Sequence, residues 1–269
     1  MALIALQSGS TGLSALNTKL DVTANNLANV NTNGFKASRV NFQDLLYQER
    51  KLPGTENAHG DQRPIGLYVG LGVQVSGTQL DFTDGPMLPT ERDLDVYIDG
   101  PGFFRVSVED GTAPDGVAYT RAGSFTLNSD GEIVLASDPG RRLIPNLQVS
   151  DEATKVEITA DGRVFESIPG EAEPQEIGRF ELAGFINPQG LKQLGENLYA
   201  ETAASGPPLV GEPNEEGLGS LVSGFVEASN VDPTEELIGL IRTQRAFEMN
   251  SQTIRTADEV LRAVSQLRR

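Results

Sequence analysis

The chain has 269 residues, of which 38% are hydrophobic, so it can bury a sizeable core in one large domain or two smaller ones. It contains no cysteine, which excludes a disulfide framework, a thiolate metal site and a cysteine nucleophile. The net charge of −17 lies wholly between residues 49 and 223, which hold 12 basic and 29 acidic residues, and this disfavours nucleic acid as a partner.

The first residues show no secretory signal. The stretch from Met1 to Leu6 lacks a basic start, and Gln7 interrupts it before it is long enough for a signal peptide's apolar region. No stretch of the sequence approaches the length of a membrane span, so we expect no direct membrane insertion.

An N-terminal helix is predicted from leucines at a strict spacing of seven: Leu6, Leu13, Leu20 and Leu27. The segment also contains glycine, threonine and asparagine, which are poor helix formers. Because isolated helices of this length are marginal in water, its stability must come from packing against a partner.

A longer C-terminal helix repeats this spacing with Leu240, Phe247, Ile254 and Leu261. Asp232 suits the N-cap, Pro233 the first helical position, and Glu235 completes a pattern like a capping box. At 1.5 Å per residue this helix would be about 50 Å long.

Helices with this spacing at both ends of one chain predict a paired coiled-coil stalk made of residues 1–44 and 224–269. The alternative is that each is an ordinary amphipathic helix packed on a globular core. The strict spacing of seven at both ends favours coiling.

The middle of the chain, residues 71–223, predicts an all-β antiparallel, barrel-like domain, so the fold class is α+β. The Asp-Gly dipeptides at 99–100, 110–111, 130–131 and 161–162 fit type I′ hairpin turns. Expected strands lie at 73–75, 103–108, 124–127, 133–135, 156–158 and 179–182. Residues 45–70 form an extended, irregular insertion between helix and middle domain.

No catalytic, cofactor-binding or metal-binding residues are predicted. One histidine, His59, builds neither a Ser-His-Asp triad nor a multi-histidine zinc site. The segment from Asn128 to Glu132 lacks the twelve-residue register of a calcium loop and is better explained as a hairpin turn. A carbohydrate- or calcium-binding module in the β-region is the alternative from another class.

An asparagine-rich segment ends the N-terminal helix. Asparagine competes with helical hydrogen bonds, accepts left-handed conformations and supplies amides for contacts with neighbouring backbone. The segment therefore predicts either a plain helix end or an assembly contact, for which the candidate residues are Asn25, Asn26, Asn29, Asn31, Asn33, Gly34 and Phe35.

Several segments carry a resemblance to the flagellar rod and hook family. They are Asn25–Lys36, Gly102-Phe-Phe-Arg105, Tyr119–Phe125, Gly195-Glu-Asn-Leu-Tyr199, Gly224–Val231 and Glu235–Asn250, and they follow the family's order along the whole chain. Within this family, Asp44–Gln48 and the extension over 49–68 favour a subunit of the distal rod, with a proximal rod or hook subunit as the alternative.

The resemblance implies a structural protein and not an enzyme. In such proteins the terminal helices form the inner layer of a self-assembled helical tube in the flagellar basal body, which transmits torque across the periplasm and carries the export channel. The implied partners are copies of the chain itself, proximal rod and hook subunits, surrounding ring proteins that act as a bushing, and the flagellar export apparatus. Export by that apparatus would require no cleaved signal peptide.

Overall fold

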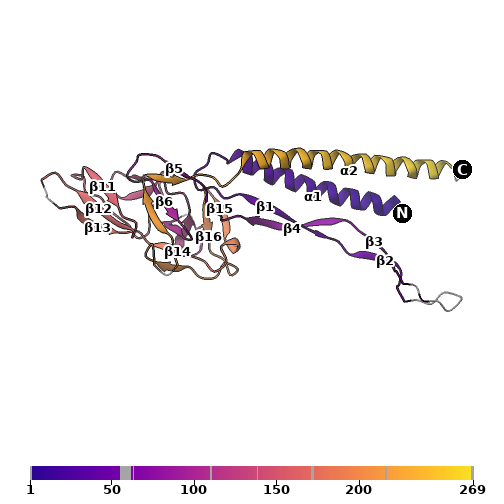
Figure 1. The fold of residues 1–269 in the computed structure, drawn as a ribbon, viewed down its shortest axis with the longest axis horizontal. Coiled ribbons are helices and arrows are strands. Elements are labelled where there is room, and N and C mark those ends of the chain that lie inside the picture. The colour runs from indigo at the N-terminus through magenta and orange to yellow at the C-terminus, as the bar shows by residue number, and fades with distance from the viewer. Residues whose placement is uncertain are drawn as a thin grey trace. The chain divides into compact units, whose positions relative to one another are not determined.

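A computed structural model describes residues 2–54, 62, 64–109, 111–137, 139–170, 173–215 and 217–267. Its architecture is α+β, with a helix at each end of the chain and short strands between them (Figure 1). The chain divides into two compact units. Unit 1 comprises Met1–Ala28, Ser38–Gln79 and Asp232–Arg269, and unit 2 comprises Asn29–Ala37 and Leu80–Val231.

The terminal helices are α1, Ala2–Ala28, and α2, Pro233–Leu267. Asp232 caps α2 as predicted, because its Oδ1 accepts hydrogen bonds from the backbone N–H groups of Thr234, at 2.7 Å, and Glu235, at 3.2 Å. The 35 residues of α2 correspond to about 50 Å of helix.

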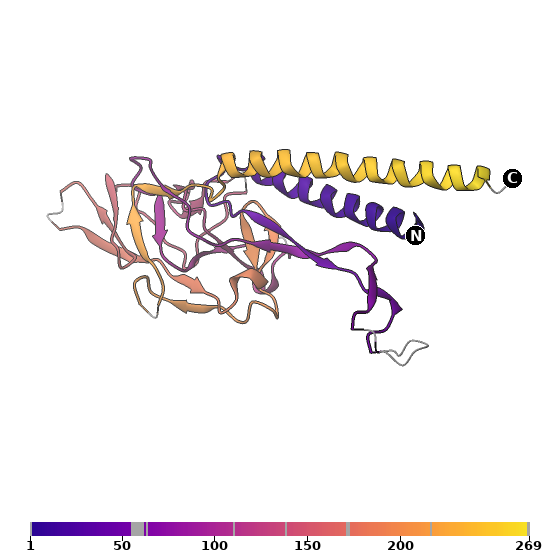
Figure 2. The same cartoon turned by 45° about the vertical axis from the view of Figure 1, so that its right-hand side comes forward.

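The two helices of unit 1 pack side by side in opposite directions (Figures 1 and 2). Near the start of α1, the Asn250 side chain of α2 donates a hydrogen bond to the backbone oxygen of Gly9 at 3.1 Å. A Cβ atom on Gly9 would lie only 2.7 Å from Ile254 Cγ1, so glycine permits this close approach. Near the other end of α1, Asn26 contacts Glu236.

Unit 1 also contains two strand pairs, which follow one another along an extended ribbon (Figure 1). The first joins β1, Ser38–Asp44, to β4, Val73–Leu80, and the second joins β2, Tyr47–Lys51, to β3, Leu67–Gly70. The sequence predicted an irregular insertion here, but its two ends pair as antiparallel strands. His59 lies outside the described residues.

Unit 2 contains a six-stranded antiparallel sheet, a three-stranded one and three two-stranded ones. The six-stranded sheet has the order β15-β16-β8-β7-β14-β17 and the three-stranded sheet the order β11-β12-β13. The two-stranded sheets are β10-β9, β18-β6 and β19-β5. The strands are β5 Met87–Pro89, β6 Val96–Asp99, β7 Phe103–Ser107, β8 Val117–Thr120, β9 Phe125–Leu127, β10 Ile133–Leu135, β11 Lys155–Ile158, β12 Arg163–Ser167, β13 Gln175–Arg179, β14 Leu182–Gly184, β15 Lys192–Gly195, β16 Leu198–Ala200, β17 Leu209–Gly211, β18 Ser220–Ser223 and β19 Phe225–Glu227, with 3₁₀ turns at Pro114–Gly116 and Pro188–Gly190.

The barrel-like arrangement expected for the middle domain is wrong. In the described part of the chain the largest sheet is open, because its outer strands β15 and β17 do not pair with each other. Its strands are short, at three to five residues, and the chain repeatedly leaves one sheet for another instead of continuing round a closed ladder.

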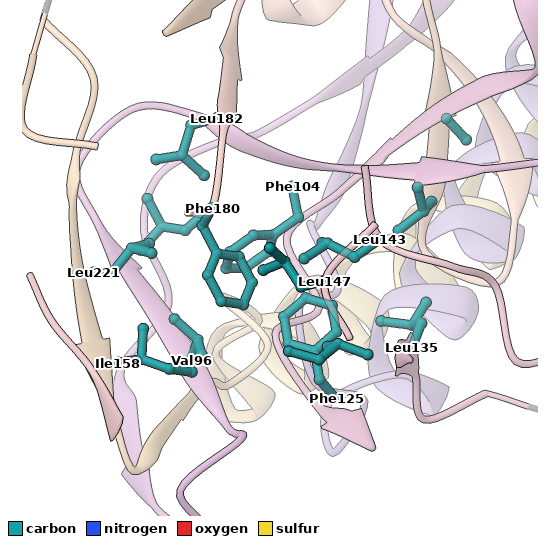
Figure 3. Close-up of a cluster of buried hydrophobic side chains, with 14 of the residues drawn as sticks. Val96, Phe104, Phe125, Leu135, Leu143, Leu147, Ile158, Phe180, Leu182 and Leu221 are labelled. Atoms are coloured by element: carbon teal, nitrogen blue, oxygen red, sulfur yellow. The ribbon is translucent and has the colours of Figure 1, made fainter. Parts of the chain in front are cut away.

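Strand β7 separates two apolar clusters in unit 2. Because successive side chains of a strand point to opposite faces, Phe104 and Val106 enter the larger cluster while Phe103 enters the smaller one. In the larger cluster, the Phe104 ring lies 5.1 Å from that of Phe125 and 6.0 Å from that of Phe180, in edge-to-face geometry (Figure 3). This cluster is the core of unit 2.

Two local predictions in unit 2 need correction. The strand expected over 179–182 is interrupted, because β13 ends in the three-stranded sheet and β14 begins in the six-stranded sheet, with buried Phe180 between them. The type I′ turns are also wrong at Asp99, Asp130 and Asp161, since only the glycine after each aspartate has a positive φ, whereas type I′ requires two such residues. Glu196 and Asn197, between β15 and β16, both have positive φ.

Charge follows the division into units. Unit 2 holds 10 basic and 27 acidic residues, which accounts for the whole net charge of −17, whereas unit 1 holds 11 of each sign. The unit that contains both helices is therefore neutral overall, and self-repulsion between copies is weaker there.

Candidate assembly surfaces

The predicted seam residues are all partly accessible in the single chain. Each is half-buried: Leu6, Leu13, Leu20, Leu27, Leu240, Phe247, Ile254 and Leu261. Among the helix residues whose burial is described, the fully buried ones are instead small or polar, namely Gly9, Ala15, Thr23 and Asn26 on α1 and Thr243 on α2. Packing within one chain therefore leaves apolar side-chain area of the seam uncovered.

Helix α2 exposes further large apolar side chains. The exposed fraction is 64% for Met249, 52% for Val260 and 49% for Ile241, and Leu237 and Ile238 are nearly half exposed. A helix that packs in a globular domain normally buries its apolar stripe. This face of α2 is therefore suited to contact with another chain.

The ribbon of unit 1 is a second exposed apolar surface. Leu46 is 85% and Ile65 80% exposed, and Tyr47, Leu67 and Tyr68 are also accessible. A two-stranded ribbon is at best marginally stable in water by itself. Both the ribbon and α2 thus present apolar area that a neighbouring molecule could cover.

Asn26 connects three elements of unit 1. Its side chain donates to Ser38 O at 2.9 Å and to Glu236 Oε1 at 2.7 Å, and its Oδ1 accepts from Ser38 N–H at 3.0 Å. Only 2% of this residue is exposed. Asn26 therefore ties α1 to β1 and α2 within one chain, a role that the sequence did not indicate.

The other asparagines of the motif are distributed over turns and surface. Asn25 and Asn31 are exposed, while the Asn29 side chain accepts a hydrogen bond from the Thr32 hydroxyl at 3.2 Å. The backbone oxygen of Asn33 accepts from the Asn197 side chain at 3.0 Å. The exposed Asn31 lies where another chain could contact it.

At position 34 any residue with a side chain would be strained. The φ of Gly34 is +69°, and a Cβ atom there would lie 2.6 Å from the backbone nitrogen of Ala122. Its N–H donates to the Glu227 backbone oxygen at 2.8 Å. Phe35, next to it, is half-buried, and its N–H donates to Thr32 O at 3.2 Å.

Lys36, which ends the motif, is a residue whose role the sequence did not reveal. It is 1% exposed, and its Nζ lies 2.5 Å from Glu227 Oε1. Burial lowers the pKa of Lys36 below its ordinary value, while the negative charge of Glu227 opposes that shift. A surface lysine is the ordinary expectation for one that follows a turn, so no local signal distinguishes this one.

The chemistry of these surfaces is that of packing and hydrogen bonding. Among the described residues, no group of three or more His, Cys, Asp or Glu side chains is arranged to hold a metal ion. In the same part of the chain, neither helix combines the length and apolar character needed to cross a bilayer.

Comparisons with known proteins identify the family. Residues 6–36 match the family described as flagella basal body rod protein, residues 97–166 the flagellar hook protein FlgE/F/G D1 domain, and residues 222–267 the C-terminal part of the flagellar basal body rod FlgEFG protein. These ranges contain the asparagine-rich motif, part of the core of unit 2 and all of α2.

Relatives align over nearly the full chain. The flagellar basal-body rod protein FlgG of Buchnera aphidicola subsp. Schizaphis graminum is 44% identical and covers 96% of both chains. FlgG of Agrobacterium fabrum is 41% identical, covering 97% of this chain and 98% of its own. The flagellar hook-basal body complex protein FlhP of Bacillus subtilis is 29% identical, covering 96% and 97%. The chain therefore belongs to the flagellar basal body rod protein family, and it is a structural protein rather than an enzyme.

Proposed function

We propose that this chain is a structural subunit of the flagellar distal rod, which polymerises into a helical tube. The terminal helices form a coiled-coil layer at the inside of the tube, and the acidic β-rich unit faces outward. The tube transmits torque across the periplasm and encloses the export channel.

The uncovered apolar face of α2 is the observation that carries this proposal. Ile241, Met249 and Val260 are each about half exposed or more, although α2 already packs on α1. Burying one such side chain contributes roughly 1.5–3 kcal/mol. A contact in which one face of each chain covers a different face of the next generates rings or open helical filaments.

The distribution of charge supports the same arrangement. Unit 1, which carries the exposed apolar side chains of α2 and of the ribbon, is neutral, whereas unit 2 carries the net charge of −17. Copies can therefore approach through unit 1 with little repulsion, while unit 2 remains solvated. The ring proteins around the rod would meet this acidic outer surface.

The remaining parts of the proposal rest on the family. Proximal rod and hook subunits bind the two ends of the polymer, and the export apparatus delivers the chain without a cleaved signal peptide. For the assembled rod we propose a division into a helical part, 1–44 with 224–269, a connecting insertion, 45–70, and an outer part, 71–223.

Polymerisation of the purified full chain tests the proposal. Ile241→Asp places a charge on the exposed apolar face of α2, and Gln193→Asp places the same charge at an exposed polar position of β15 in unit 2. We expect the first variant to raise the concentration needed for pelletable polymer about 10- to 100-fold, from the apolar burial lost. The second should behave like the unmodified chain.

Equal polymerisation of both variants would show that this face of α2 is not an interface. The position along the rod needs a separate measurement, namely labelling of the protein in purified basal bodies. Label next to the hook supports the distal rod, and label confined to the membrane-proximal end contradicts it.

A further inference from the structure

A buried ion pair joins residues near the two ends of the chain inside unit 2. Lys36 Nζ lies 2.5 Å from Glu227 Oε1, and the side chains are 0% and 1% exposed. Lys36 Nζ also donates to Thr83 O at 2.7 Å, and Glu227 Oε1 also accepts from Gly85 N–H at 2.9 Å. Three segments that are distant in sequence therefore meet at two charged atoms.

Arg121 adds a second cation to this pair. Its Nη1 lies 3.7 Å from Glu227 Oε2 and its Nη2 lies 3.3 Å from Asp84 Oδ1, while its side chain is 3% exposed. The Glu227 carboxylate thus lies between two cations. Loss of Glu227 removes the carboxylate that pairs with Lys36 and leaves Arg121 with Asp84, whereas loss of Lys36 still leaves Glu227 beside Arg121.

Further hydrogen bonds, between backbone groups and to the Asn230 side chain, join the same segments around the charges. Gly34 N–H donates to Glu227 O at 2.8 Å, and Ala37 N–H donates to Asn230 Oδ1 at 2.7 Å. Asp81 N–H donates to Ala37 O at 2.8 Å, and the Asn230 side chain donates back to Asp81 O at 2.9 Å. Each of these segments is held by both of the others.

These segments also lie beside three of the four points at which the chain passes between its two units. Unit 2 begins its main stretch at Leu80, ends it at Val231, and includes Asn29–Ala37. Burying a lone charge costs several kcal/mol, so burial of Lys36 is unfavourable until Glu227 is in place. Ordering at the three passages is therefore coupled.

We propose that Lys36, Arg121 and Glu227 form an ionic clasp that orders together three of the four passages between the units, namely those after Ala37, before Leu80 and after Val231. The clasp closes only when the last strand of unit 2, β19, has delivered Glu227. Building on the function proposed above, a subunit with an open clasp keeps the core of unit 2 but does not polymerise, because its connections to the helices remain unordered.

Hydrogen exchange on the full chain tests the coupling, with Lys36→Met, Glu227→Met and the double variant. We expect each single variant to speed exchange of the Gly34, Ala37 and Gly85 amides about 100-fold or more, while β7 stays protected. The double variant should exchange more slowly than Glu227→Met, because Lys36 is no longer a buried charge without its partner.

Two further variants keep the test decisive. Arg179→Met is the control. It breaks an exposed ion pair, in which Arg179 Nη1 lies 2.8 Å from Glu212 Oε2, and it should leave exchange at all three passages unchanged. Where Glu227→Met also deprotects β7, Glu227→Gln replaces it, since it retains the shape and the acceptor for Gly85 N–H. Faster exchange only beside the substituted residue overturns the clasp. So does a double variant whose loss of protection, as a free energy, equals the sum of the losses in the two single variants.

The same samples separate the clasp from the proposed function. Clasp variants with protected β7 should remain in the supernatant under conditions in which the unmodified chain pellets as polymer, and polymer formed by an open-clasp variant overturns the link to assembly. If the unmodified chain does not polymerise, the proposed function fails, while the exchange result still decides on the clasp.

Discussion

Replacing Asn26 by alanine should loosen the helix pair of unit 1 without unfolding unit 2. The substitution removes two hydrogen bonds to the Ser38 backbone and one to the Glu236 carboxylate. A neutral hydrogen bond contributes about 1 kcal/mol net and one to a charged group about 1.5–3 kcal/mol. Allowing for non-additivity, we expect a loss of about 3 kcal/mol, because water can reach the broken partners only in part.

Amide exchange followed by mass spectrometry measures this loss in each unit separately. A loss of about 3 kcal/mol corresponds to roughly 100-fold faster exchange in α1 and α2. Peptides from β7 and β8 in unit 2 should exchange as in the unmodified chain. Asn26→Asp should cost at least as much, since it loses both donated bonds and places a carboxylate against Glu236.

Asn17→Ala is the matched control, because Asn17 lies at an exposed position of the same helix. Alanine is the better helix former, so this change should slow exchange slightly or leave it unaltered. Exchange in α1 and α2 within a factor of three of the unmodified chain for Asn26→Ala would refute the assignment of Asn26 as the link between α1, β1 and α2.

Three further outcomes are expected. Leu13→Asp or Ile254→Asp should abolish filament formation while unit 2 stays folded, as followed by pelleting and near-ultraviolet circular dichroism; normal filaments from either variant would contradict the seam. Gly34→Ala should destabilise unit 2 by about 2–4 kcal/mol in chemical denaturation, because it combines a positive φ with a clash against backbone, and an unchanged midpoint would contradict this. Burial raises the pKa of Tyr199 above its ordinary value. Its contribution to the free energy of unfolding is therefore complete below pH 10 and is lost as the pH rises further, because the unfolded chain releases this proton first. Above pH 10 the free energy of unfolding should therefore fall less steeply with pH in Tyr199→Phe than in the unmodified chain, by up to about 1.4 kcal/mol per pH unit. Identical slopes in the two proteins would contradict a raised pKa of Tyr199.

Much of the local structure could be predicted from the sequence. Both terminal helices, the cap at Asp232 and most of the expected strands follow from short-range rules of spacing, capping and alternation. The strand expected across Phe180 could not be predicted correctly, since nothing local shows that the chain changes sheets there. An open rather than closed sheet is likewise a property of strand order, which alternation does not specify.

The sequence by itself determined the helical ends, the β-rich middle, the acidic charge and the family motifs, because each depends on residue types and on residues that are close together in the sequence. Only the tertiary structure decided that Lys36 is buried against Glu227, 191 residues away, and that Asn26 reaches Glu236, 210 residues away. The physical reason is that the cost of burying a charge or an amide depends on partners that folding brings from distant parts of the chain. The leucines of the predicted seam stay half-buried in the single chain, and we propose that neighbouring copies cover their remaining area.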